Sequence, residues 1–73
     1  MNIKLLEIEL QKLGISRRVY SLNGASDERL CIELLNDKWR IFFVERGMER
    51  TLKEFDREDS ACEFMLNELR YEV

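Results

Sequence analysis

Residues 30 to 45 constrain the fold most strongly, because they predict a β-hairpin whose register can be checked pair by pair. With Asn36-Asp37 as a two-residue turn, one face of the hairpin is wholly apolar, and the other is mixed with an opposite-charge pair at its centre. The apolar face pairs Leu34 with Trp39, Ile32 with Ile41 and Leu30 with Phe43; the mixed face pairs Leu35 with Lys38, Glu33 with Arg40 and Cys31 with Phe42, with Val44 further along. A shift of one residue would scatter these matches, so the pattern favours this register.

The chain on either side of the hairpin predicts two helices and one further strand. The first helix is expected from about residue 3 to residue 13 and ends at Gly14, and the last runs from an Asp56 cap to about residue 70 or 71. A short strand is expected over residues 17 to 22. Residues 48 to 55 are expected to form a loop with some extended character, with a further strand as the alternative.

Each helix carries an apolar stripe that we expect to face the hairpin. The stripes are Ile3, Leu6, Leu10 and Leu13 in the first helix, and Cys62, Met65, Leu66, Leu69 and Val73 in the last. Leu5 and Ile8 lie off the first stripe and are expected to broaden its buried face, with a second contact surface as the alternative. We therefore predict a single small domain over residues 1–73 with an α+β fold. Its α-β-β-β-α order gives a three-stranded antiparallel sheet with both helices on one face.

The chain contains no histidine, and this absence excludes several kinds of chemistry. Ser-His-Asp and Cys-His catalysis and histidine metal sites cannot form, and no pair of carboxylates, lysines or tyrosines is marked out by its spacing. We therefore expect no enzyme activity, no metal site and no cofactor. Cys31 and Cys62 do not form a zinc-binding pattern and are expected to be buried, reduced thiols. The N-terminal residues carry charges every few positions, which argues against a signal peptide or membrane span and favours a cytoplasmic location.

Acidic residues gather toward the end of the chain. Residues 56 to 73 hold six acids and two bases, whereas residues 1 to 55 hold nine acids and ten bases. This asymmetry favours a basic protein partner over nucleic acid. The predicted element order also resembles that of double-stranded RNA-binding domains. However, the last helix starts with Asp56-Arg57-Glu58-Asp59, which would repel a phosphate backbone, so RNA binding is not expected.

Two surfaces are candidates for binding a partner. The first is the last helix, where four acids and an aromatic pair form the candidate site: Asp56, Glu58, Asp59, Glu63, Phe64 and Tyr71. A position at the buried margin of the core is the alternative for the two aromatic residues. The second surface is the mixed face of the hairpin, which is expected to be open because both helices cover the other face: Cys31, Leu35, Phe42 and Val44. Scattered, tolerated apolar residues are the alternative there.

A family resemblance lies in the segment Trp39-Arg40-Ile41-Phe42-Phe43-Val44-Glu45-Arg46-Gly47, followed by Phe55, by Glu58-Asp59-Ser60-Ala61-Cys62 and by Leu66. This pattern resembles small bacterial proteins of the polymorphic-toxin immunity type. The resemblance implies stoichiometric binding that blocks a cognate toxin domain, often a nuclease with a basic active-site cleft. A small regulatory or structural homodimer that uses the open sheet face is the alternative function. The motif also allows a structural interpretation, in which Glu45 and Arg46 form an ion pair with the start of the last helix.

Overall fold

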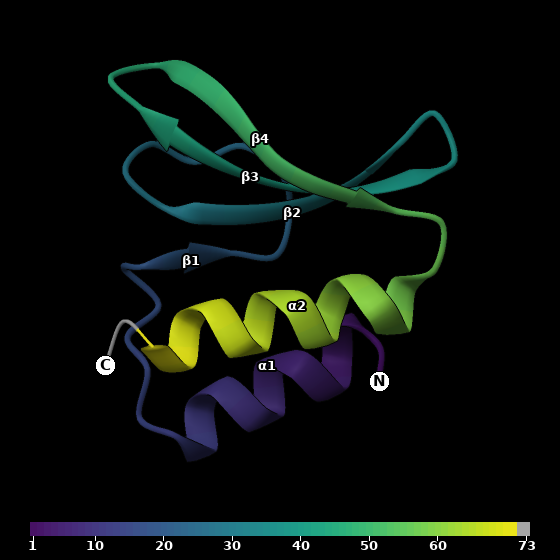
Figure 1. The fold of residues 1–73 in the computed structure, drawn as a ribbon. Helices are drawn as coiled ribbons and strands as arrows, with labels where there is room; N and C mark the ends of the chain where they lie inside the picture. Colours follow the sequence, from purple (N-terminus) through teal and green to yellow (C-terminus); the bar gives the residue numbers. More distant parts are fainter. Residues whose placement is uncertain (72–73) are drawn as a thin grey trace.

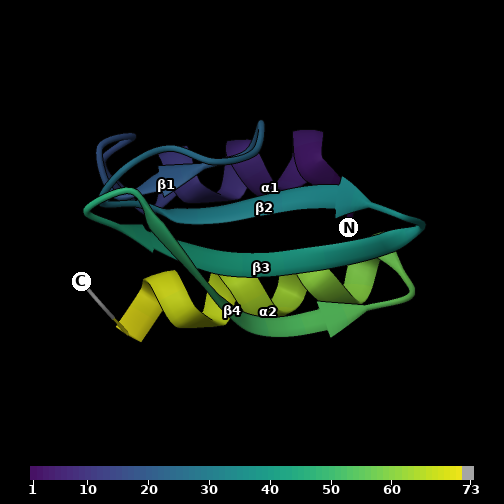
Figure 2. The ribbon, with the colours of Figure 1, turned by 90° about the horizontal axis from the view of Figure 1, so that it is seen from above.

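A computed structural model describes residues 1–71 and shows two layers, a four-stranded sheet and two helices that cover one of its faces (Figure 1). The elements in chain order are α1 (Ile3–Lys12), β1 (Tyr20–Ser21), β2 (Leu30–Leu35), β3 (Lys38–Glu45), β4 (Met48–Phe55) and α2 (Glu58–Tyr71). Seen from above the sheet, α1 lies under β1 and β2, and α2 lies under β3 and β4 (Figure 2). The predicted α+β fold with both helices on one face is confirmed. Within residues 1–71, no helix combines the length and the apolar character that crossing a bilayer would require.

The β2–β3 hairpin has the predicted register at all six of its pairs. Asn36 and Asp37 have φ angles of 52° and 63°, so the turn meets the type I′ requirement for positive φ at both central residues. The wholly apolar face of the hairpin meets the helices. Its buried members are Leu30, Ile32 and Ile41.

The sheet differs from the prediction in two ways. It has four strands in the order β1-β2-β3-β4, and the short β1 pairs with β2 in parallel, so the sheet is mixed and not wholly antiparallel. Residues 48–55, expected to be a loop, form β4 along the outer side of β3. The cause is local, because Arg46 and Gly47 have φ angles of 53° and 78° and close a second turn of the type I′ kind. The sequence pattern did not favour this strand, because β4 is exposed along nearly its whole length and lacks the apolar–polar alternation of a half-buried strand.

Helix α1 begins and ends close to the predicted residues. The Asn2 side chain accepts a hydrogen bond from the backbone N–H of Leu5 at 2.9 Å and caps the start. At the other end Gly14 has a φ of 73°, and a backbone hydrogen bond from Ile15 to Leu10 completes a Schellman motif. Leu5 and Ile8 are exposed, so the expectation that they broaden the buried face is wrong. Leu13 is exposed as well, because it lies at the C-terminal cap of the helix, so the expected stripe ends at Leu10.

Helix α2 supplies the other half of the main core, which lies between the helices and the sheet. The buried residues of this core are Leu6, Leu10, Ile15, Tyr20, Leu30, Ile32, Ile41, Ala61, Cys62, Met65 and Leu69. Leu66 is half-buried beside it, and Val73 lies outside the described residues. The expected Asp56 cap is wrong, because Asp56 lies two residues before the helix and pairs with Lys38 instead.

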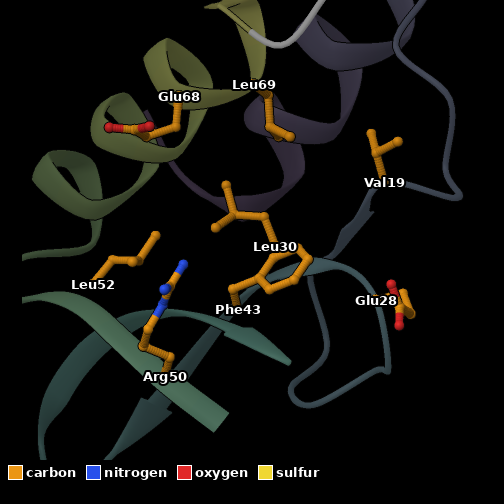
Figure 3. A pocket seen from close by; sticks show the side chains of 8 residues that line it. All are labelled: Val19, Glu28, Leu30, Phe43, Arg50, Leu52, Glu68 and Leu69. Atoms are coloured by element: carbon orange, nitrogen blue, oxygen red, sulfur yellow. The ribbon is translucent and has the colours of Figure 1, made fainter. Parts of the chain in front are cut away.

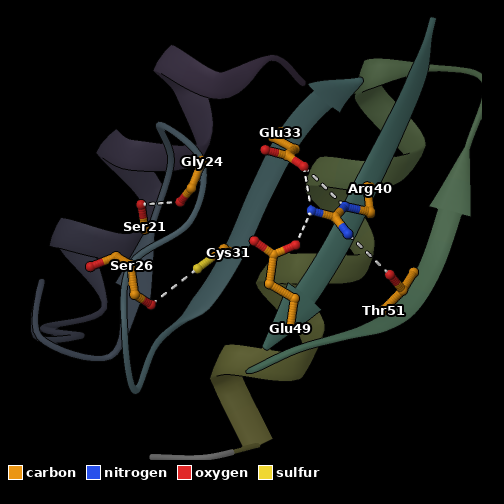
Figure 4. A network of polar contacts seen from close by, with 8 residues as sticks. All are labelled: Ser21, Gly24, Ser26, Cys31, Glu33, Arg40, Glu49 and Thr51. Carbon is orange, nitrogen blue, oxygen red and sulfur yellow. Dashed lines mark hydrogen bonds and ion pairs between the residues drawn. The ribbon is translucent and has the colours of Figure 1, made fainter. Parts of the chain in front are cut away.

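The outer face of the sheet is closed and not open. Cys31, Phe42 and Val44 form a second, smaller core there, and only Leu35 of the four expected interface residues is exposed. The segment before β2 reaches over this face, where the Cys31 thiol lies 3.5 Å from the carbonyl of Ser26 (Figure 4). Both cysteines are free and buried, as predicted. A homodimer held by an open apolar sheet face therefore has little exposed apolar surface to use.

Candidate functional site

Each of the three acids around the start of α2 has a partner within the described part of the chain. Asp56 pairs with Lys38, and the Arg57 guanidinium donates two hydrogen bonds to Asp59, at 2.8 and 3.0 Å. The carboxylate of Glu58 accepts a hydrogen bond from the backbone N–H of Ile3 at 2.9 Å, which ties α2 to α1.

The same contacts shift the pKa values of two groups near the start of α2. The hydrogen bond from Arg57 lowers the pKa of Asp59 below its usual value. The hydrogen bond and charge of Asp56 raise the pKa of Lys38. The acids that the sequence singled out at this end of the chain therefore act first as structural groups. Their negative charge at the start of the helix also suits the helix dipole.

The other predicted residues of α2 have different environments. Glu63 is exposed and has no ion pair within the described part of the chain. Phe64 is half-buried, with its ring centroid 5.5 Å from that of Phe55, and the Lys53 ammonium lies 5.3 and 5.7 Å from the two ring centroids. Tyr71 is 90% exposed. The aromatic pair is therefore split, with Phe64 at the margin of the core and Tyr71 in solvent.

The motif residues at the end of β3 do not reach the start of α2. Arg46 and Gly47 form the β3–β4 turn, which lies at the opposite end of the sheet from the beginning of α2 (Figure 2). The expected ion pair of Glu45 and Arg46 with the helix start is therefore wrong. The backbone N–H of Gly47 instead donates to the Asp27 side chain at 3.1 Å and holds the turn against the segment before β2.

Arg40 organises a polar cluster on the outer face (Figure 4). Its guanidinium donates to Glu33 at 3.0 Å, to Glu49 at 2.7 Å and to Thr51 at 3.3 Å. The same group lies 4.0 Å from the centroid of the Phe42 ring. The Arg40 side chain is only 14% exposed, so this cluster seals the small outer core and leaves no free cation for a ligand.

A groove that the sequence did not indicate lies between β4 and α2, with a volume of about 550 Å³. We call it the β4–α2 groove. The residues that line it are Val19, Glu28, Leu30, Phe43, Arg50, Leu52, Glu68 and Leu69 (Figure 3). The floor is apolar, and the charged residues come from three separate segments. The volume falls within the range of about 300–1,000 Å³ that is usual for binding pockets. Sequence reasoning missed this site because it depends on β4, and residues 48–55 were expected to form a loop, with a strand only as the alternative.

Metal-ligand clusters and reactive thiols are two kinds of chemistry that the described residues allow us to assess. Among residues 1–71, no group of three or more His, Cys, Asp and Glu side chains is placed to hold a metal ion. Burial raises the pKa of the Cys31 thiol and raises that of Cys62 to about 11, with Glu58 as a further cause for Cys62. Both thiols are therefore protonated near neutral pH and are poor nucleophiles. What the arrangement offers is an apolar, partly charged surface for binding.

Comparisons with family models, with curated proteins and with solved structures gave no match to this chain.

Proposed function

We propose that this chain is a non-enzymatic protein-binding module of the immunity or inhibitor type, and that it holds its partner at the β4–α2 groove. One observation carries the proposal: the groove combines an apolar floor with charged walls beside an exposed strand. Leu52 is exposed on its β4 side, and Phe43 is half-buried on its floor. Interfaces of this kind have an apolar centre and a polar rim.

The surroundings of the groove supply further contact groups. Tyr71 lies three residues beyond Glu68 on α2, close to the same side of the helix, and tyrosine is one of the residues that most often dominate binding energy. Met48, at the start of β4, is also largely exposed. β4 is an edge strand that pairs only with β3 among the described strands, so its outer backbone groups are accessible.

The charge of the chain supports a basic partner, such as a toxin nuclease domain. The net charge is −3, and the acids are concentrated toward the C-terminal end. Because Asp56, Glu58 and Asp59 already have local partners, their contribution is long-range attraction that raises the rate of association. Glu63 has no ion pair among the described residues and lies outside the groove lining, so its contribution is also long-range.

The test begins with capture of a partner from the source cells and ends with purified components. The partner must bind the purified chain with fixed stoichiometry and lose its activity in the complex. Leu52→Glu places a charge at the groove without touching the buried core, and we expect it to weaken binding at least tenfold. Glu63→Lys is the matched surface control, and we expect only a modest loss that grows at low salt.

Three results would contradict the proposal. One is that Leu52→Glu binds as the native chain does, after circular dichroism has shown that it is folded. Another is that charge reversal at Glu63 alone abolishes binding. That result would assign the binding site to the exposed side of α2 around Glu63. The third is that the only species captured is a second copy of this chain, which would make it a homodimer.

A further inference from the structure

We propose that the β4–α2 groove recognises an extended segment of the partner protein in which an apolar side chain is followed by an aspartate or glutamate. The apolar side chain enters between Phe43, Leu52 and Leu69, and the carboxylate pairs with Arg50. This inference rests on the proposed function and names the chemistry of its ligand.

Arg50 carries the argument for a carboxylate. Its pairing with Phe43 on β3 puts it on the helix-facing side of the sheet, and its guanidinium points toward Leu30 and Leu52 (Figure 3). Within residues 1–71, no carboxylate lies within ion-pair distance of Arg50, whereas Arg40 has two such partners and Arg57 has one. Glu28 and Glu68 also line the groove, but neither forms an ion pair with Arg50, so the guanidinium faces the apolar floor without a paired carboxylate among the described residues. A carboxylate from a ligand could pair with the Arg50 guanidinium through two parallel hydrogen bonds, the bidentate geometry that arginine favours.

The other charged side chain on the helix-facing side of β4 is also positive. Lys53 pairs with Ile41 and so also lies on the helix-facing side, where it covers the rings of Phe55 and Phe64. The acids of β4, Glu49 and Glu54, pair with the outward-facing residues Val44 and Arg40 and lie on the opposite side of the strand. The helix-facing side of β4 is therefore basic, and Arg50 is its member in the groove, whereas the acids of the groove, Glu28 and Glu68, come from other segments.

The edge position of β4 identifies the ligand as a protein segment. An extended chain can form backbone hydrogen bonds to an unpaired strand edge while alternate side chains enter pockets beside it. The shift in register between Ile41 and Phe42 leaves Leu52 as an extra residue of β4, and such bulges interrupt regular strand pairing. The bulge limits the added pairing to a few residues, so a short segment and not a long strand fits this edge. A fatty acid offers the same apolar and carboxylate groups but cannot use the strand edge.

The test uses two blocked tetrapeptides, acetyl-Ser-Leu-Asp-Ser-amide and acetyl-Ser-Leu-Lys-Ser-amide, with decanoate as a third probe. Each is titrated into the isotope-labelled chain, and binding is followed by NMR. We expect the aspartate peptide to shift the methyl resonances of Leu30, Leu52 and Leu69 and to bind about two to five times more tightly than the lysine peptide, the range for a partly exposed ion pair. Arg50→Gln should remove this preference. Arg70→Gln, which makes the same change of charge on α2 outside the groove, should keep it.

Equal binding of the two peptides, or tighter binding of the lysine peptide, would overturn the inference while leaving the groove as a binding site. A preference that survives Arg50→Gln would assign the carboxylate to another residue and also overturn it. Tighter binding of decanoate at the same resonances would replace the protein segment by a small amphiphile. If no probe shifts the groove resonances, the inference fails, and the Leu52→Glu experiment then decides separately whether the groove binds the partner.

Discussion

Replacing Arg40 with methionine tests whether the outer face of the sheet is a sealed second core. The side chains of Arg40, Glu33 and Glu49 are 14%, 24% and 41% exposed, so the charges are partly withdrawn from water. Methionine is an unbranched apolar side chain that removes the charge and the guanidinium contact with the Phe42 ring, and it leaves two carboxylates without their cation. Breaking a fully buried pair costs about 3–5 kcal/mol. Partial solvent exposure lowers this, and we expect a loss of about 2 kcal/mol in the free energy of unfolding.

Urea denaturation followed by circular dichroism measures this loss. Arg18→Met is the matched control, because Arg18 is exposed and forms no ion pair within the described residues, and its effect should stay within about 0.5 kcal/mol. The double variant Glu33→Gln with Arg40→Met should cost about 1 kcal/mol less than the two single changes added together. A loss below about 0.5 kcal/mol for Arg40→Met, with no coupling to Glu33, would refute the assignment of the cluster as the seal of the outer core.

Three further predictions follow from single contacts. Tyr20→Phe should raise the free energy of unfolding by about 1 kcal/mol in urea denaturation, because the buried hydroxyl has no hydrogen-bond partner among the described residues; a loss of stability would show that it has one. The pKa of the Cys62 thiol is about 11 in the fold and 9.0 ordinarily. As the pH rises, this thiol ionises first in the unfolded chain, so the free energy of unfolding should fall by up to about 3 kcal/mol between pH 9 and 11. Cys62→Ala should flatten that decline, and an unchanged slope would contradict it. Glu58→Ala should speed hydrogen exchange at the start of α1 through loss of the Ile3 contact, and unchanged exchange rates would count against that tie.

The parts of the fold that short-range patterns determine were predicted from the sequence. The β2–β3 register follows from pairs that are close along the chain, and Gly14 marks the end of α1 through its own backbone geometry. β4 was only the alternative prediction for residues 48–55, because an exposed edge strand needs no apolar alternation and the clearest local signal was the glycine of the Arg46-Gly47 turn.

The candidate site was harder to predict because it depends on tertiary pairing. The sequence marked Asp56, Glu58 and Asp59 as available acids, yet each has a partner, and two of those partners, Lys38 and the backbone of Ile3, are far away along the chain. The closure of the outer face was missed because the burial of Cys31 and Phe42 depends on a connecting segment that has no regular sequence pattern. The groove joins residues from β2, β3, β4 and α2, so it exists only once those elements have packed.

The measurement that tests the central claim most directly is hydrogen–deuterium exchange of the chain alone and in complex with its captured, purified partner. The proposed function predicts protection of β4 and of the end of α2 from Glu68 to Tyr71, with little change at residues 56–63. Protection confined to residues 56–63, or to the outer-face segment that contains Ser26, would contradict the claim that the β4–α2 groove binds the partner.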